Sequence, residues 1–390
     1  LRRQRQMCIR DSNESICKGE MEMKELINSI GKKKLIMIFG GIVGVVVLII
    51  ICLLLYNAFF VSNTYSSVES KIVQAAMEYY GKHQNLLPKS PNDEVSVNST
   101  TLTSSGYLGD LQEMVPDEGV SCTATVTVTN VNNNYRYVAN LKCGDKYQTE
   151  TFVNHVKSVE RTVVTGQGLY DMNGELVYRG ENPNNYVKFA DRLWRIVKFE
   201  NDSAMLILDD KYARSVWDDR FNTERNRNDG INDYSVSRAN DALTNLYNGE
   251  DLFSASDKLL IVAHDLAIGK RGETIQYNDG SVEKSQVLED RYIGLLPLYD
   301  YINVSLDENC SSASTQSCSN YNYLNLLESS WWLLTGDSDT THRVYRIDSS
   351  GIIGLTRAST NSYLRPVIYL AKDAIYVGGD GTFENPYLVK

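Results

Sequence analysis

A run of 27 residues without a formal charge, residues 35–61, constrains this chain more than any other feature. About 20 apolar residues in a helix suffice to span a bilayer. Lys32, Lys33 and Lys34 precede the run, and the next basic residue is Lys71. Because basic residues mark the cytoplasmic end of a spanning helix, we expect a single-pass cell-membrane protein with its N-terminus inside and its C-terminal domains extracellular. A cleaved signal peptide is the alternative, but the run is long for one and no A-x-A-like site follows it.

The residues before the run, 1–34, form the expected cytoplasmic tail. Residues 6–12 read QMCIRDS, which resembles the translation of a transposase adapter used in sequencing libraries. We therefore interpret residues 1–12 as a sequencing artefact and leave them out of the fold. A genuine basic tail is the alternative.

Beyond the run, the chain is strongly acidic and holds an even number of cysteines. The whole chain carries a net charge of −10 and residues 1–34 carry +4, which leaves −14 for residues 62–390. Such a surface repels phosphate backbones, so we expect no nucleic-acid partner. Four of the seven cysteines lie here, and their spacing predicts two local disulfides, Cys122–Cys143 and Cys310–Cys318.

Residues 62–160 are predicted to form a small module in which a helix packs on an antiparallel sheet. Apolar residues recur at three- and four-residue steps over residues 66–83, which indicates a helix. Residues 120–144 read as a hairpin that turns at Asn132-Asn133, because asparagine tolerates the positive φ of such turns. The residue numbers of each cross-strand pair then sum to 265. This register separates an apolar face from a mostly polar one and sets Cys122 opposite Cys143.

This order of membrane helix, continuing helix and disulfide-closed sheet resembles type IV pilins and pseudopilins. The resemblance implies a subunit of an envelope filament. The chain departs from that family because no glutamate stands near the start of the apolar run and no processing site is evident beside Gly31.

Residues 165–390 are predicted to form a second, larger α+β domain. Strand patterns cover residues 168–210, with turns at Asn173-Gly174, at Asp191-Arg192 and at residues 201–203. Two helical patterns follow, over residues 235–249 and 254–266, the second of which includes His264. Strand patterns return from residue 331 to the end, which gives the mixed order of an α+β fold.

A series of segments in this domain resembles a poorly characterised extracellular domain family of Gram-positive bacteria that follows a membrane anchor. Its order of strands and helices is similar to the C-type-lectin-like fold, which also underlies the formylglycine-generating enzymes. The segments are LWRIVKFE (193–200), YIGLLPLYDYIN (292–303), SWWLLTGDS (330–338), VYRIDSSGIIG (344–354), LRPVIYL (364–370) and GGDGTFENPYLV (378–389).

Three tryptophans with two neighbouring aspartates make the candidate ligand-binding set. Neighbours on a strand point to opposite faces, so one of Trp331 and Trp332 is expected in the core. The other either packs under a loop, which we favour, or stacks on a ligand such as a sugar ring. Trp217, Asp218 and Asp219 form the second part of this set.

The following Asn/Asp-rich loop offers the one candidate metal site. Asn228, Asp229 and Asp233 supply the oxygen ligands that Ca²⁺ prefers. The spacing does not match an EF-hand, and a solvated loop is the favoured alternative. We expect no other cofactor.

These observations leave three hypotheses of function. The favoured one is a membrane-anchored, cell-surface binding or adhesion protein for a cell-wall, glycan or protein ligand, and not an enzyme. The second is a pilin-like structural subunit. The third is an enzyme of the formylglycine-generating type, but the chain lacks the copper-binding cysteines of that group, since Cys310 and Cys318 are expected to pair.

Overall fold

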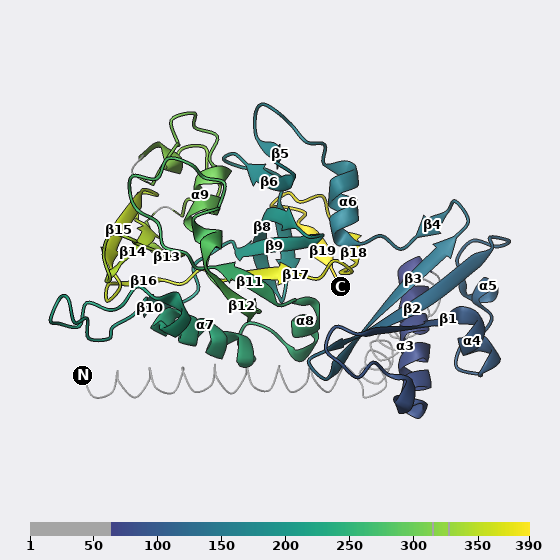
Figure 1. Ribbon diagram of the computed structural model, residues 1–390. Coiled ribbons are helices and arrows are strands. Elements are labelled where there is room, and N and C mark those ends of the chain that lie inside the picture. The colour runs from purple at the N-terminus through teal and green to yellow at the C-terminus, as the bar shows by residue number, and fades with distance from the viewer. Residues whose placement is uncertain (1–63, 314–315, 327) are drawn as a thin grey trace, which may run out of the picture.

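The computed structural model describes residues 64–313, 316–326 and 328–390. The predicted tail (1–34) and membrane helix (35–61) lie outside this part of the chain. Within the described residues, no helix is both long and apolar enough to cross a bilayer. The described residues adopt an α+β fold with two separate hydrophobic cores, which confirms the expected class. Figure 1 shows the two units side by side, the first in purple and blue and the second in teal to yellow.

The first unit is a four-stranded antiparallel sheet with a long helix packed against it. The sheet has the order β1-β2-β3-β4. Helix α3 contacts strands β2 and β3 (Figure 1). The elements are α3 (Tyr65–Lys82), η1 (Gln84–Leu86), β1 (Glu94–Asn98), α4 (Ser99–Ser104), α5 (Leu111–Met114), β2 (Cys122–Val131), β3 (Asn134–Cys143) and β4 (Tyr147–Gln148).

Helix α3 forms where its apolar spacing predicted it. Thr64 caps its N-terminus by accepting a hydrogen bond from the Ser67 amide, which satisfies one of the unpaired amides of the first turn. The buried face includes Val68 and Ile72 and ends on Tyr80, while Tyr79 stays half-buried. The helix therefore has its apolar stripe against the sheet, as amphipathic packing requires.

The hairpin of β2 and β3 has the predicted register at every pair, from Cys122 opposite Cys143 to Val131 opposite Asn134. Asn132 and Asn133 have φ values of 54° and 65°. The turn is thus a two-residue turn with positive φ at both central residues, the kind whose twist matches that of the strands. The predicted disulfide Cys122–Cys143 is present and closes the open end of the hairpin.

The described part of the second unit contains three sheets. An eight-stranded mixed sheet includes the path β17-β9-β8-β7-β19-β18, with β6 pairing β8 and β5 pairing β6; a five-stranded sheet has the order β10-β16-β13-β14-β15; β11 and β12 form a pair. The strands are β5 (Gly168–Met172), β6 (Glu175–Arg179), β7 (Tyr186–Phe189), β8 (Arg192–Glu200), β9 (Ser203–Leu208), β10 (Arg214–Val216), β11 (His264–Ala267), β12 (Val287–Arg291), β13 (Trp331–Gly336), β14 (Arg343–Ile347), β15 (Ile353–Arg357), β16 (Asn361–Tyr363), β17 (Val367–Leu370), β18 (Tyr376–Gly378) and β19 (Tyr387–Val389).

The first helix of this unit, α6 (Phe152–Val159), lies before residue 165, where the second domain was expected to begin. The helices that follow it are η2 (Tyr234–Val236), α7 (Arg238–Asn248), α8 (Ala255–Leu260), η3 (Glu283–Ser285), α9 (Leu298–Val304) and η4 (Gln316–Ser319). From the sequence, residues 152–160 are predicted to belong to the first module. The structure packs Phe152, Val153 and Val156 of α6 in the second core instead, near Tyr387.

Two local predictions in this unit were wrong. The helix expected over residues 254–266 ends at Leu260, and His264 opens strand β11. The β-branched residues Ile261 and Val262 explain this ending, since they fit a pleated strand better than a helix; Ile261 bridges to Leu370 of β17. The turn placed at Asp191-Arg192 lies one residue earlier, at Ala190-Asp191, because Arg192 pairs with Phe189.

Polar contacts join the two units. Arg136 of β3 forms an ion pair with Asp373, with Nη2 2.8 Å from Oδ1, and donates to the Leu259 carbonyl. Lys390 reaches Glu69 of α3 at 3.1 Å. Arg136 and Glu69 are buried, whereas the side chains of Asp373 and Lys390 are 21% and 40% exposed. These partly shielded contacts hold β3 and α3 against the second unit.

Candidate functional site

The two tryptophans of strand β13 lie in the core. All six residues of this strand are buried, and Trp331 and Trp332 have an exposed fraction of 0%. The Trp332 indole donates to the Ser215 carbonyl of β10 at 2.9 Å. Trp331 packs edge-on against Tyr301 at 5.8 Å. Both faces of the strand are therefore covered, which favours the packing alternative over stacking on a ligand.

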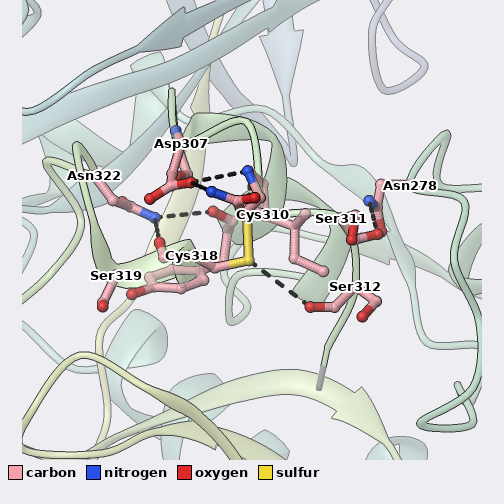
Figure 2. Close-up of a disulfide and its surroundings, with 12 residues drawn as sticks. Asn278, Asp307, Cys310, Ser311, Ser312, Cys318, Ser319 and Asn322 are labelled. Carbon is pink, nitrogen blue, oxygen red and sulfur yellow. Dashed lines mark hydrogen bonds between the residues drawn. A yellow bond between two sulfur atoms is a disulfide. The ribbon is translucent and has the colours of Figure 1, made fainter. Parts of the chain in front are cut away.

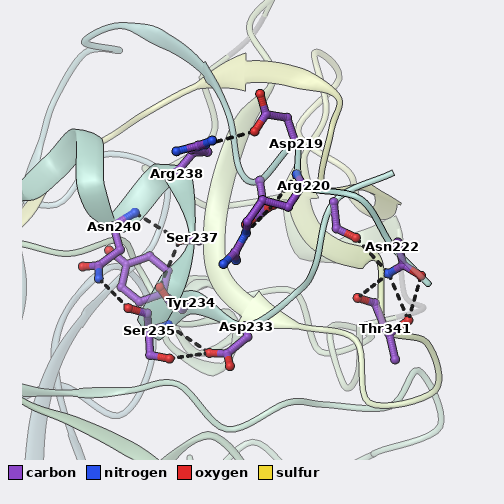
Figure 3. Close-up of polar contacts among 12 residues, drawn as sticks. Asp219, Arg220, Asn222, Asp233, Tyr234, Ser235, Ser237, Arg238, Asn240 and Thr341 are labelled. Atoms are coloured by element: carbon purple, nitrogen blue, oxygen red, sulfur yellow. Dashed lines mark hydrogen bonds and ion pairs between the residues drawn. The ribbon is translucent and has the colours of Figure 1, made fainter. Parts of the chain in front are cut away.

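The second part of the predicted ligand set is also held by the protein itself, and Figure 3 shows one member of it, Asp219, beside Arg238. Trp217 is fully buried and its indole donates to the Leu333 carbonyl. Asp218 is buried against Arg220, whose Nε lies 2.7 Å from Oδ2. Asp219 accepts from Arg238 Nε at 3.0 Å. These carboxylates hold the loop in place.

The three residues of the predicted calcium site do not converge. Asp229 is surrounded by arginines, with distances of 3.2 Å to Arg225, 2.7 Å to Arg227 and 3.5 Å to Arg357. Asn228 is exposed. Asp233 caps η2 by accepting from the Ser235 amide (Figure 3). In the described part of the chain, no three His, Cys, Asp or Glu residues are placed to hold a metal ion. The arginines around Asp229 occupy the position that a cation would take, so this arrangement disfavours calcium binding at Asp229.

The second predicted disulfide is confirmed. Cys310 and Cys318 are bonded in the loop that follows α9 (Figure 2). Asn322 donates to the Cys318 carbonyl, and Asn278 donates to the Ser311 carbonyl from a neighbouring loop. The bond and these amides fix the loop on the domain. Neither thiol is free to bind copper while the disulfide is intact.

Sequence reasoning missed a polar pocket between strand β11 and the start of α9. The pocket has a volume of about 440 Å³. Its apolar lining includes Met205, Leu266, Leu295, Pro297, Tyr299 and Tyr369, and its polar lining consists of Glu200, Asn201, His264, Asp265 and Lys284. The His264 ring stacks on Tyr369 with centroids 3.6 Å apart. Pockets that pair an apolar wall with a few convergent polar groups are the usual form of a small-ligand site.

A fully buried lysine lies beneath this pocket. Lys198 Nζ lies 3.0 Å from the Tyr299 hydroxyl and 3.1 Å from Asp300 Oδ1. Glu200 and Glu175 add carboxylate oxygens at 3.5 Å and 3.6 Å. An isolated buried ammonium would be very costly. These four oxygens are what make the burial of Lys198 tolerable.

The local backbone structure orients the side chains of Lys198 and Tyr299 towards each other. Strand β8 has a bulge at Val197, because Ile196 pairs with Leu206 whereas Lys198 pairs with Met205. Such a bulge re-aims the side chains beside it. The Tyr299 ring is fixed from outside by Gly280, which has a φ of 76°, and a Cβ at that position would lie 2.9 Å from the ring.

The charges of the pocket and its floor are unequal. Four carboxylates (Glu175, Glu200, Asp265 and Asp300) face two ammonium groups (Lys198 and Lys284). Burial alone would raise the pKa of Glu200, but the hydrogen bond from His264 and the charge of Lys198 lower it to about 2. Glu200 is therefore ionised at any physiological pH, and the pocket has an acidic rim.

The sequence carried a weak signal for this site. Lys198 stands in a strand whose residues from Trp194 to Phe199 are all buried, and a lysine in such an apolar run is rarely fully buried unless it is paired. The partners come from β6, β8 and α9, however, and only the folded topology brings them together.

Comparison of the chain with protein-family models, with curated proteins and with solved structures finds no match.

Proposed function

We propose that this chain is a membrane-anchored, cell-surface binding protein that takes the positively charged amine of a small polar ligand into the pocket at Glu200 and His264. A free amino group of a cell-wall peptide is a ligand of this class. The observation that carries the proposal is the excess of carboxylates at this pocket. Glu200 and Asp265 face Lys284 in the lining of the pocket of about 440 Å³. Glu175 and Asp300 face Lys198 beneath it. Lys284 offers an internal precedent, because its ammonium already lies 2.7 Å from Glu175.

The rest of the proposal rests on sequence. The run at 35–61 anchors the chain with its N-terminus inside, and the two disulfides suit an extracellular domain. The second unit is proposed to be C-type-lectin-like and the first to be pilin-like. The three tryptophans are not part of the proposed binding surface.

A binding titration tests this function. The full chain in detergent micelles is titrated with soluble cell-wall peptides that carry a free amine, and with the same peptides after N-acetylation. We expect saturable binding of the free amine and at least about tenfold weaker binding of the acetylated form, which corresponds to about 1.4 kcal/mol. Equal binding of the two forms would refute the proposal.

Variants then locate the binding. Glu200→Gln and Asp265→Asn remove charges from the pocket at nearly constant shape. Each is expected to weaken the binding of the free-amine peptide several-fold. Glu118→Gln, an exposed glutamate in the first unit, serves as the matched control for net charge. An equal loss in the control would mean that the amine is attracted by the acidic surface in general and not by this pocket.

A structural role as a pilin-like subunit is the second candidate function. It is favoured by α3 lying along a sheet that Cys122–Cys143 closes. Electron microscopy of the cell surface with an antibody against residues 64–148 tests it. Filaments that carry the antibody would support this role, and label spread evenly over the membrane would count against it.

A further inference from the structure

Lys198 and Asp300 form an ion pair of ordinary length in which both partners are buried. Lys198 has an exposed fraction of 0% and Asp300 of 2%, and Nζ lies 3.1 Å from Oδ1. The two residues belong to different elements, strand β8 and helix α9, and are about one hundred positions apart in the chain. Burying both charges is expensive, and the attraction between them often fails to repay the cost.

We propose that the side chains of Lys198 and Asp300 condense to an amide bond that covalently joins strand β8 to helix α9. The reaction needs no oxidant or cofactor. An amine and a carboxylic acid give an amide and one molecule of water.

The steps balance with the groups present. The Lys198 ammonium first passes a proton to the Asp300 carboxylate, which leaves a neutral amine beside a neutral acid. The amine nitrogen attacks Cγ of Asp300, and a C–N bond forms. A neighbouring carboxylate, Glu200 at 3.5 Å or Glu175 at 3.6 Å, accepts the second proton of the nitrogen. It returns that proton to the departing hydroxyl, and the C–O bond breaks with release of water.

The environment of Asp300 raises the population of the neutral form that this reaction requires. Burial raises the pKa of Asp300 to about 6, although the charge of Lys198 opposes the rise. The pKa of Lys198 is also raised, because its acidic neighbours outweigh the effect of burial. Loss of a proton from the Lys198 ammonium is therefore the unfavourable part of the reaction, and the adjacent carboxylates are needed as proton acceptors.

The second carboxyl oxygen of Asp300 also supports the amide bond. Within the described residues, Asp300 Oδ2 is buried and has no hydrogen-bond partner. Buried polar atoms without partners are uncommon and costly. Condensation removes one of the two carboxyl oxygens, and with it this unsatisfied atom. The water has an exit, since Glu200 and Tyr299, which contact Lys198, also line the pocket.

The decisive experiment maps the peptides of the unmodified full chain. The chain is denatured, its disulfides are reduced, and it is digested with trypsin for mass spectrometry. We expect Lys198 to resist cleavage, and we expect the peptide that contains it to be joined to the peptide that contains Asp300, lighter than their sum by one water. Other dehydrations also lower the intact mass, so the joined peptide is the criterion. Quantitative recovery of separate peptides, with cleavage after Lys198, would overturn the proposal.

The chain supplies its own control. Lys284 lies 2.7 Å from Glu175, but both side chains are about one-third exposed, at 37% and 33%. If burial drives the reaction, Lys284 is cleaved normally in the same digest. The variants Lys198→Arg and Asp300→Ala are expected to abolish the joined peptide, and Glu200→Gln to reduce its yield. A joined peptide that persists in Asp300→Ala would assign the bond to another residue and refute this one.

Discussion

The guanidinium of Arg365 lies over the Trp331 indole, with Cζ 5.0 Å from the ring, and neither side chain is exposed to solvent. Arg365 donates to the carbonyls of Leu208 and Leu324, both at 2.7 Å. A buried guanidinium normally needs an acidic partner; here carbonyls and an aromatic face stabilise it. The tryptophan strand and the Arg-Pro-Val segment are thus two halves of one packing arrangement.

The first prediction concerns this arrangement. Trp331→Ala should lower the free energy of unfolding by about 3–5 kcal/mol, because it leaves a large cavity in the core. Urea denaturation of the full chain measures the change. Phe221→Ala, at an aromatic residue that is 51% exposed, is the control and should change stability by about 0.5 kcal/mol or less. A variant that keeps its stability but loses binding would return Trp331 to a ligand-binding role.

The hairpin of β2 and β3 was the part of the fold most open to prediction. Its register follows from two local signals that agree, the alternation of faces and the Asn132-Asn133 turn. A one-residue slip would move every apolar side chain to the wrong face. The boundary between the cores was harder to predict, since α6 could pack on either side and only the folded chain shows that Phe152 joins the second core.

The residues of the candidate site could not be predicted from the sequence, for a different reason. Tryptophans and clustered aspartates attract attention in a sequence, yet Trp332 is packed in the core and Asp229 is paired with arginines. The residues that do converge on a pocket are ordinary ones. Their convergence depends on long-range topology and on the bulge at Val197, for which no local pattern is diagnostic.

The second prediction is that calcium does not stabilise the fold. Asp229 already has three arginine partners, so a cation entering the loop would meet positive charge. The melting temperature of the full chain should be the same in calcium and in chelator. A bound ion stabilises the folded state in proportion to its occupancy, so a calcium-dependent rise in melting temperature would revive the calcium site.

The third prediction compares the two disulfides. Removing Cys122–Cys143 by paired Cys→Ser substitution should cost about 3 kcal/mol, and removing Cys310–Cys318 somewhat less, about 2.5 kcal/mol. The order follows from the sequence separations of 21 and 8, because a longer closed loop restricts the unfolded chain more. Chemical denaturation of each double variant measures both values. The reverse order would show that native contacts of the shorter loop, and not chain entropy, dominate.

The fourth prediction concerns acid. The folded-state pKa of Glu200, about 2, is below the ordinary value of about 4.3. Its ionised form therefore stabilises the fold above about pH 4.3, and this contribution is lost as the pH falls towards 2. In chains whose Asp300 is still a free carboxyl, its raised pKa, about 6, acts in the opposite sense: the protonated form favours the fold below about pH 3.8, and this contribution is lost as the pH rises through 6.

A comparison of variants isolates Glu200. The stability difference between the unmodified chain and Glu200→Gln should be full by about pH 5 and should shrink towards pH 2. Urea denaturation at a series of pH values measures it. The hydrogen bond from His264, the largest of the causes that lower the pKa, does not depend on whether Lys198 is free or in an amide. A difference that stays constant over this range would show that Glu200 titrates normally.

The fifth prediction concerns the junction of the two units. Arg136→Met removes the ion pair with Asp373 and the hydrogen bond to the Leu259 carbonyl. It leaves Asp373, whose side chain is 21% exposed, without its partner. Breaking a largely buried pair in this way should cost about 3 kcal/mol. Because β3 and α8 meet at this residue, their amides should exchange with solvent faster in the variant.

Hydrogen exchange of the full chain, followed by mass spectrometry of peptides from residues 134–143 and 255–260, measures this effect. Arg161→Met, at an exposed arginine, removes the same charge without touching the junction and should leave both peptides unchanged. Exposed charges contribute little to stability, so a shift in this control would indicate a general electrostatic effect. If Arg136→Met exchanged like the unmodified chain, the apolar contacts between β3 and α8 would by themselves be sufficient to hold the two units together.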